Sequence, residues 1–212
     1  MTYETQDMVV MEQLEAFLED LDTTTPLLEL GADLLSTTNS AINSINSQRT
    51  KDEPKIKSLS ALLPVQVAGI IQKTNHIIRI DYSKYGSDRE SSPLAMYVAD
   101  GPGAGTYTTE VELIARIIKE IAPSQGIRFK DEVVAILKME APQKQRESNE
   151  NLIPLNNGIY DYRNKILMDF DPYYIFISKS SVDYNPSATD KVILSISLYT
   201  FSSRMFELYN IL

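Results

Sequence analysis

The sequence predicts an α+β fold in which an N-terminal helical hairpin precedes a small, mostly antiparallel sheet with flanking helices. Apolar residues recur at three- and four-residue spacing before residue 48, which is typical of amphipathic helices. After residue 75 they occur in short runs rich in β-branched and aromatic side chains, which is typical of strands. The chain has 212 residues, of which 43% are apolar. That is enough for one globular domain or two small ones.

The helical hairpin is expected from two apolar stripes. Met11, Leu14, Leu18 and Leu21 predict a helix over about residues 7–21, which ends at the threonines and the proline of 23–26. A second helix is expected from Leu27 into the forties, although its second half is rich in Ser, Asn and Thr, which are poor helix formers. Its stripe consists of Leu27, Leu30, Leu34, Leu35, Ile42 and Ile45. We expect the hairpin to pack on the rest of the chain, the alternative being a partner protein.

Composition suggests three segments. Residues 48–58 are polar and charged and contain Pro54, which makes them the best linker candidate. The expected division is an acidic helical hairpin at 1–50, an α+β domain at 55–190 and an apolar C-terminal tail at 191–212.

The middle of the chain alternates between expected strands and helices. A short helix interrupted near Pro64 is expected at 61–73, strands at 76–82 and 94–98, and a polar loop at 83–92. A helix should follow Thr109, which has capping-box spacing with Glu112. Its inward residues would be Val111, Ile114, Ile118 and Ile121.

The following residues predict another helix and then a meander. Asp131 to Met139 is expected to be helical, with Val133, Val134 and Leu137 facing inward, and 142–150 to be a polar loop. Residues 152–170 predict three strands joined by turns at 156–158 and 163–165, and 173–177 predicts an aromatic strand.

The sequence matches none of the catalytic, metal-binding or cofactor-binding patterns that we considered. The chain has no cysteine, so thiolate metal sites and disulfides are excluded. Its one histidine, His76, is more simply a packed or half-exposed side chain. The glycine-rich stretch 100–107 lacks the lysine of a P-loop and the third glycine of a dinucleotide fingerprint, so we interpret it as a turn. Asp169 and Asp171 flank a turn and are interpreted as solvated. We expect no catalytic residue, no metal and no cofactor.

The charge is unevenly distributed. The net charge is -9, which argues against strong DNA binding by the isolated chain. Residues 1–22 hold seven acids and no base, and removing these seven leaves 22 acids and 20 bases in residues 23–212. The body is therefore nearly neutral and leaves room for a local basic patch. We see no secretory leader and no apolar run long enough for a membrane span, so we expect no membrane association.

Residues 151–188 carry the informative pattern, which has the form N-x-I-P-x-x-N-G-x-x-D, then F-x-P-x-Y with a later lysine, then Y-x-P-x-A. We call its matching residues the signature residues: Asn151, Ile153, Pro154, Asn157, Gly158, Asp161, Phe170, Pro172, Tyr174, Lys179, Tyr184, Pro186 and Ala188.

This pattern resembles the domain just ahead of the superfamily 3 helicase motor in phage and plasmid primase-helicases, which are relatives of the poxvirus replicative primase-helicase. The resemblance covers roughly residues 55–190. It implies a role in DNA replication on a mobile element, in the cytoplasm of a bacterial host. The implied partners are a helicase motor domain or other replication proteins, single-stranded DNA and further copies of the chain.

The resemblance implies a non-catalytic module, since the motor's P-loop and the priming module do not occur in this sequence. Arg163, Lys165 and Lys179 are the candidate DNA contacts, because exposed bases beside aromatic residues can hold single strands. The sequence leaves the family pattern near residue 189, which is expected either of a truncated or frame-shifted gene product or of a closing strand or helix. The alternative function is an independent interaction module that acts through the acidic hairpin; an enzyme of unfamiliar type is the third reading.

Overall fold

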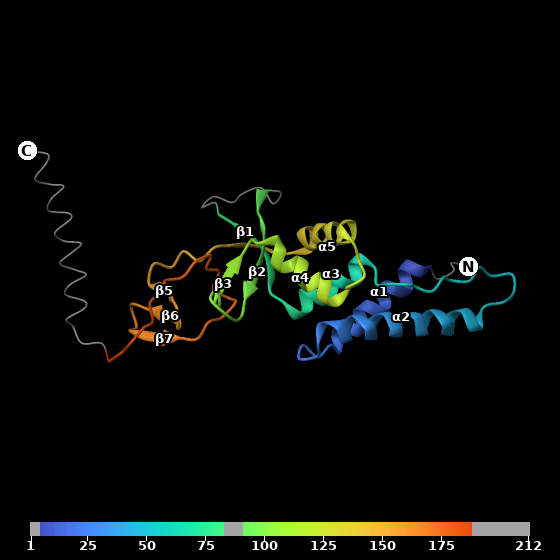
Figure 1. Ribbon diagram of the computed structural model, residues 1–212, viewed down its shortest axis with the longest axis horizontal. Helices are drawn as coiled ribbons and strands as arrows, with labels where there is room; N and C mark the ends of the chain where they lie inside the picture. Colours follow the sequence, from blue (N-terminus) through green and yellow to red (C-terminus); the bar gives the residue numbers. More distant parts are fainter. Residues whose placement is uncertain (1–4, 83–90, 188–212) are drawn as a thin grey trace, which may run out of the picture. The chain divides into compact units, whose positions relative to one another are not determined.

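The computed structural model describes residues 5–82 and 91–187, and it divides into two compact units. The first unit comprises residues 1–150 and 170–179, and the second comprises 151–169 and 180–212. The described residues contain five helices and two small sheets (Figure 1), which confirms the α+β prediction. The division at 1–50, 55–190 and 191–212 stays a prediction, and the expected tail and the greater part of the expected loop at 83–92 lie outside the described residues.

The first unit begins with the predicted hairpin, α1 (Gln6–Glu19) and α2 (Leu27–Gln48), whose helices lie side by side (Figure 1). Leu14 and Leu34 are buried in the main core, so the hairpin packs on the rest of its own unit as expected. Met11 was expected to face inward but is exposed, and this prediction was wrong. Val10 is buried instead, because it lies four residues before Leu14 and so shares its helix face.

Two asparagines of α2 hold the segment that follows it. Asn46 donates from Nδ2 to the carbonyl oxygen of Ile56 and accepts from its N–H, both at 2.8 Å. Asn39 makes the same pair of bonds with Leu59, at 2.9 and 2.8 Å. The expected linker at 48–58 is therefore tied to α2, and the polar residues that weaken this helix locally serve to bind the connecting chain.

Helix α3 (Pro64–Thr74) is joined to the hairpin by a buried polar contact. Gln66 is fully buried; its Nε2 donates to the Thr38 hydroxyl of α2 at 3.1 Å. Its Oε1 accepts from the N–H of Leu63 at 2.9 Å, so both ends of the amide are satisfied. Pro64 stands at the first position of the helix rather than interrupting it, because a residue there needs no intrahelical N–H partner.

The four-stranded sheet of this unit has the order β3-β2-β1-β4. Strands β1 (Ile77–Asp81), β2 (Leu94–Val98) and β3 (Thr106–Thr108) pair antiparallel, whereas β4 (Gln143–Gln145) pairs parallel to β1. The prediction of a loop throughout 142–150 was wrong. Three polar residues show no strand alternation, so only their pairing with β1 reveals the strand.

One face of the sheet lies against α3, α4 (Val111–Ile121) and α5 (Ile127–Glu140). Ile77, Leu94 and Met96 supply the sheet side of this core. In α4, Ile114, Ile118 and Ile121 are buried as expected, but Val111 is exposed. The predicted capping box also fails: Glu110 is the N-cap and no side chain caps the helix. Helix α5 begins four residues before the predicted start.

The opposite face of the sheet is covered by residues 170–179, which return to the first unit and which we call the return segment. Its Ile175 packs with Ile78, Ile80, Ala95 and Tyr107. The prediction of a strand at 173–177 was wrong, because this segment forms no ladder. Two of its carbonyls accept backbone bonds from different parts of the unit: the N–H of Tyr107 donates to the Phe176 carbonyl at 2.7 Å, and that of Glu147 donates to the Ile175 carbonyl at 2.9 Å.

The second unit contains the predicted meander. Strands β5 (Leu152–Leu155), β6 (Gly158–Asp161) and β7 (Ile166–Met168) form an antiparallel sheet with β6 in the centre. Gly158 has a φ of 150°, and a Cβ there would lie 2.5 Å from the carbonyl oxygen of Met168. A glycine is therefore required where β6 approaches β7. No helix among the residues described is long and apolar enough to cross a membrane.

Candidate nucleic-acid interface

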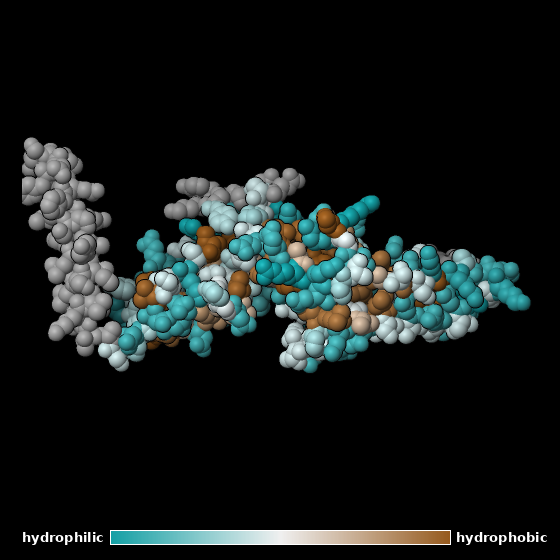
Figure 2. All heavy atoms as spheres, in the orientation of Figure 1, coloured by the Kyte–Doolittle hydropathy of each residue, from teal (hydrophilic) through white to brown (hydrophobic). Residues whose placement is uncertain are grey.

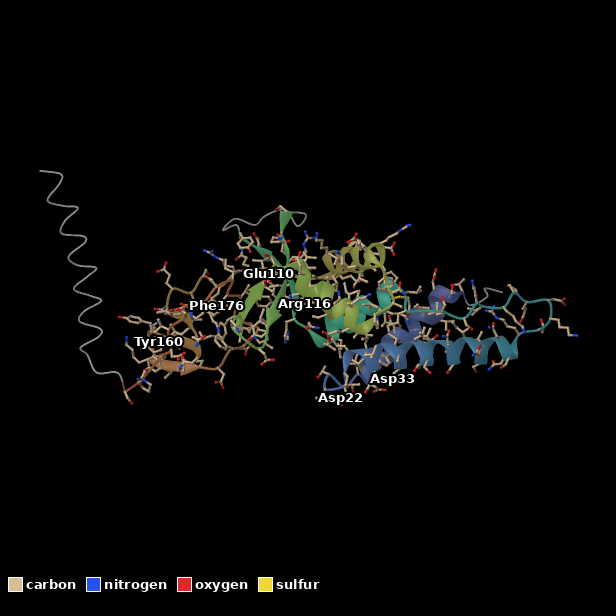
Figure 3. All side chains as sticks on the ribbon, in the orientation of Figure 1. Asp22, Asp33, Glu110, Arg116, Tyr160 and Phe176 are labelled. Atoms are coloured by element: carbon tan, nitrogen blue, oxygen red, sulfur yellow. The ribbon has the colours of Figure 1, made fainter. Side chains whose placement is uncertain are left out.

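In the second unit, several signature residues hold the backbone of the meander. Asn157 donates from Nδ2 to the Tyr184 carbonyl at 3.0 Å and accepts at Oδ1 from the Tyr184 N–H at 2.8 Å. This places the Tyr184 ring on Tyr160 of β6 (labelled in Figure 3), with ring centroids 4.6 Å apart and planes inclined by 23°. The carbonyl of Pro154 accepts from the N–H of Ser180 at 2.9 Å.

Asp161 organises the turn between β6 and β7. Its Oδ1 accepts from the N–H groups of Arg163 and Asn164, both at 2.9 Å, and its Oδ2 accepts from the Asn164 side chain at 2.7 Å. The backbone bond from Asn164 has the largest effect and lowers the pKa of this carboxyl. Burial acts in the opposite direction, but the Asn164 side chain and the bond and charge of Arg163 lower the pKa further, so it stays below its ordinary value. Asp161 is thus an ionised turn-forming residue rather than a proton donor.

In the first unit, the signature residues anchor the return segment on the sheet. Pro172 accepts at its carbonyl from the buried Tyr107 hydroxyl at 2.7 Å. Phe170 lies against the backbone of Gly105: a Cβ there would meet the ring at 2.1 Å, and the φ of Gly105 is 85°. The Lys179 amino group lies 5.0 Å from the centre of the Phe170 ring, within cation–π range.

The remaining signature residues have less defined roles. Tyr174 is half-buried and stacks on Phe176. The Asn151 carbonyl accepts from the N–H of Tyr162 at 2.8 Å, Ile153 is exposed on β5 and Pro186 is exposed. Ala188 lies outside the described residues. Most of the signature residues therefore have a structural role, because they hold the backbone of the unit to which they belong.

The glycine-rich stretch is a turn, as predicted. Gly101 and Gly105 have positive φ, and the N–H of Gly105 donates back to the Val98 carbonyl at 2.9 Å. This turn connects β2 to β3. The Phe170 ring lies so close to Gly105 that no side chain would fit there, which explains why this position is a glycine. Sequence reasoning missed this pair, since Gly105 and Phe170 are far apart in the chain and belong to no common motif.

The three basic side chains predicted to contact DNA lie in different units. Arg163 and Lys165 lie in the exposed turn of the second unit, whereas Lys179 belongs to the first. The Lys165 amino group lies 3.5 Å from the centre of the exposed Tyr162 ring, and Lys165 has a φ of 60°. This turn therefore brings two cations and an aromatic ring together on the surface.

A face of the second sheet extends this surface. The register places Ile153, Tyr160 and Leu167 opposite one another across the three strands, so their side chains share one face. Ile153 and Leu167 are exposed, and Tyr160 and Tyr184 are half-buried. Stacked tyrosines with exposed aliphatic neighbours are chemically suited to contact bases or an apolar partner surface.

The histidine and the two aspartates considered as possible catalytic residues are exposed side chains. His76 is exposed and makes an edge contact with Tyr97, at 6.0 Å between ring centres. It lies at a cleft of about 520 Å³ that also includes Lys144, Asp171 and Tyr173. Asp171 and Asp169 are exposed, and Asp171 accepts from the Tyr173 N–H at 2.7 Å. Among residues 5–82 and 91–187, no group of three potential metal ligands gathers.

Comparison with protein families decides the relationship. A family model described as "D5 N terminal like" matches residues 66–203, about two thirds of the chain. The chain belongs to this D5 N-terminal-like family. The family is that of the N-terminal domain of phage and plasmid primase-helicases, so the resemblance found in the signature residues is confirmed. The matched region starts and ends later than the expected 55–190. No curated protein matches the chain.

The family match begins at Gln66 within α3 and includes α4, α5, both sheets and the return segment, whereas the hairpin α1–α2 lies before it. The conclusion that follows directly is membership of a DNA replication primase-helicase family.

Proposed function

We propose that the chain is a non-catalytic module of a phage or plasmid primase-helicase, acting in the cytoplasm of a bacterial host. Its task would be to assist the assembly or the DNA engagement of a superfamily 3 helicase motor. The observation that carries the proposal is the family match over residues 66–203. The sequence adds that no glycine-lysine-serine/threonine loop is present to bind nucleotide phosphates.

The structure supports a binding role better than a catalytic one. Most of the signature residues form turns or hold nearby backbone through hydrogen bonds, as Asn157, Asp161 and Pro172 do. What they leave exposed is the turn that carries Arg163 and Lys165 beside Tyr162. Cations that neutralise phosphates and rings that stack on bases are the means by which proteins hold single strands.

The first experiment concerns DNA. Fluorescence anisotropy at low salt would measure binding of labelled single-stranded DNA to the full chain, to Arg163→Ala/Lys165→Ala and to Lys179→Ala. The matched control is Lys51→Ala/Lys55→Ala, which removes two exposed charges before the family match. We expect weak, salt-sensitive binding that the Arg163/Lys165 variant reduces about tenfold and the control leaves nearly unchanged. Equal effects of both double variants would exclude this turn as the contact.

The second experiment concerns catalysis. The purified chain, with and without single-stranded DNA, should neither release phosphate from ATP nor synthesise primers. DNA-stimulated phosphate release that a point mutation of this chain abolishes would refute the non-catalytic role. Sedimentation of the chain alone and with a family helicase motor would test the assembly role.

A second candidate function, an independent protein-interaction module, rests on the hairpin α1–α2, because this part lies outside the family match and is strongly acidic. It would be favoured if the chain bound no DNA at low salt and did not associate with a helicase motor.

A further inference from the structure

The helices α1 and α2 enclose a groove at the end of the hairpin where the loop 20–26 joins them. Its volume is about 420 Å³. We call the apolar part of its lining the floor: Ala16, Phe17, Leu21 and Leu30. Gln13, Thr25 and Thr37 add uncharged polar groups to the lining. Leu30 is buried and Phe17 and Leu21 are half-buried, since both of them also pack against the main core. Apolar surface near this end of the hairpin is visible over the first turns of α2 (Figure 2).

The rim of the groove is acidic. Asp20, Asp22 and Asp33 line it, and all three are exposed. Asp22 lies in the loop and Asp33 on α2, at the same end of the hairpin (Figure 3). Asp22 accepts from the N–H and the hydroxyl of Thr24, at 2.9 and 2.8 Å, and these bonds fix its position at the rim. Within the part of the chain that the structure describes, no lysine or arginine pairs with these carboxylates.

The net negative charge of the protein comes from the hairpin segment. Residues 1–48 contain nine acids and no lysine or arginine, so of 29 acids 20 remain in residues 49–212, where they equal the 20 bases. The hairpin alone thus accounts for the net charge of -9. A surface of one sign attracts partners of the opposite sign and repels DNA or a second copy of the same hairpin.

We propose that this groove is the docking site of a partner protein's amphipathic helix, which carries lysine or arginine residues beside an aliphatic side chain. The aliphatic side chain would lie on the floor at Phe17 and Leu30, and the cations would face Asp20, Asp22 and Asp33. An apolar face laid in a groove between helices is a common mode of peptide recognition. The rim charges supply charge complementarity, which sets the association rate and partner choice. This inference rests on the second candidate function and deepens it by naming the chemistry of the partner. The hairpin precedes the family match, so the inference is independent of DNA binding by the turn at 161–165.

The first test uses a fluorescent 14-residue peptide in which leucine recurs at three- and four-residue spacing and the other positions are lysine. A scrambled peptide of the same composition is the peptide control. The full chain should bind the amphipathic peptide about tenfold more tightly than the scrambled one, since only the former presents an apolar stripe. Equal binding of both peptides would overturn the proposal, as would no binding of either at low salt.

The second test separates the groove from general attraction. Asp20→Asn/Asp22→Asn/Asp33→Asn removes three rim charges, whereas Glu12→Gln/Glu15→Gln/Glu29→Gln removes three exposed charges from the same hairpin outside the groove. Each exposed charge contributes only modestly by itself, but the three rim charges would face the cations of the bound peptide together. The rim variant should therefore weaken binding about tenfold and its control much less. If both variants weaken binding equally, the peptide is held by charge alone and the groove is not a docking site.

The third test addresses the floor. Ala16→Arg places a long side chain and its cation in the groove, and the exposed Asn43→Arg adds the same charge to α2 outside it. Both positions are exposed on helices, so both variants should keep the thermal midpoint of the wild type. Ala16→Arg should abolish peptide binding and Asn43→Arg should retain most of it. Retention in both variants would exclude the floor from the contact.

Discussion

The side-chain amide of Asn157 pairs with both backbone polar groups of Tyr184. Nδ2 donates to the Tyr184 carbonyl at 3.0 Å, and the Tyr184 N–H donates to Oδ1 at 2.8 Å. The same arrangement joins Asn39 to Leu59 and Asn46 to Ile56. In each case an asparagine, in the turn between β5 and β6 or on α2, satisfies the donor and the acceptor of one residue in an irregular segment. The fold thus uses asparagine amides to attach irregular chain to α2 and to the turn between β5 and β6.

Asn157→Ala should release the segment around Tyr184. The substitution leaves both backbone groups to water and removes the constraint that places Tyr184 on Tyr160, at a cost of roughly 1–2 kcal/mol in local stability. Hydrogen exchange should show faster exchange of the Tyr184 amide. Asn43→Ala, which removes an exposed amide from α2, is the control and should leave that exchange unchanged. An unchanged Tyr184 amide in Asn157→Ala would contradict the assigned role.

Gly105→Ala should destabilise the first unit far more than Gly101→Ala. Both glycines have positive φ, 85° and 78°, so both substitutions carry a backbone cost of roughly 1 kcal/mol. Only at Gly105 would the new Cβ collide with a ring, that of Phe170 at 2.1 Å, whereas nothing lies within 4 Å at Gly101. We expect a further loss of roughly 2–3 kcal/mol at Gly105 in urea unfolding.

A double variant checks this explanation. Adding Phe170→Ala to Gly105→Ala removes the collision, so the two substitutions should cost less together than the sum of their separate effects. Strict additivity would show that the close approach of Phe170 to Gly105 contributes nothing.

Tyr107→Phe should lower stability and change its dependence on pH. Burial, followed by the neighbouring Tyr97 and Asp171, raises the pKa of Tyr107 to about 12. The unfolded chain loses this proton near its ordinary pKa of about 10, earlier than the folded chain does. Stability from Tyr107 is therefore fully present below pH 10 and falls as pH rises from 10 to 12.

Urea unfolding at several pH values measures this effect. At neutral pH, Tyr107→Phe loses the bond to the Pro172 carbonyl and should be less stable by roughly 1–2 kcal/mol. The difference from the wild type should shrink between pH 10 and 12. Tyr162→Phe, at an exposed ring, is the control and should follow the wild type throughout. A constant difference for Tyr107→Phe would refute the raised pKa.

Asp161→Asn should make the turn at 161–165 insensitive to acid. The bonds from Asn164 and Arg163 lower the pKa of Asp161, so its contribution to stability is present above its ordinary value of 3.8 and is lost as pH falls through the lowered value. In the wild type, the Arg163 and Asn164 amides should lose protection from exchange in strong acid. In Asp161→Asn, their protection should be lower at neutral pH but independent of pH. Acid loss of the same size in both would assign it to another group.

Much of the secondary structure could be predicted, because it rests on local periodicity. The spacing of Ile114, Ile118 and Ile121 predicts the buried face of α4, and the apolar run Leu94–Val98 coincides with β2. Local patterns did not predict an element whose structure depends on a partner far away in the sequence. The strand β4 exists because β1 pairs with it. The failed capping prediction is a local error instead, because the helix begins one residue later than expected and Glu110 takes the N-cap position.

The candidate site shows the same limit. The sequence located the signature residues, but their roles come from partners remote in the chain: Gly105 for Phe170, Tyr107 for Pro172 and Asn157 for Tyr184. The acidic groove could have been suspected from the absence of any base in residues 1–48. Its apolar floor could not, since Phe17 and Leu30 also satisfy the pattern of ordinary core residues.

The sequence by itself determined the α+β class, the helical hairpin, the meander and the family, because periodicity, turn residues and the signature are properties of neighbouring positions. Only the tertiary structure decided that residues 170–179 leave the meander and cover the second face of the first sheet. Burying Ile78, Ile80 and Tyr107 requires an apolar cover, and the chain supplies it with Ile175, about seventy positions beyond Tyr107. No local pattern encodes which surface such a segment will cover.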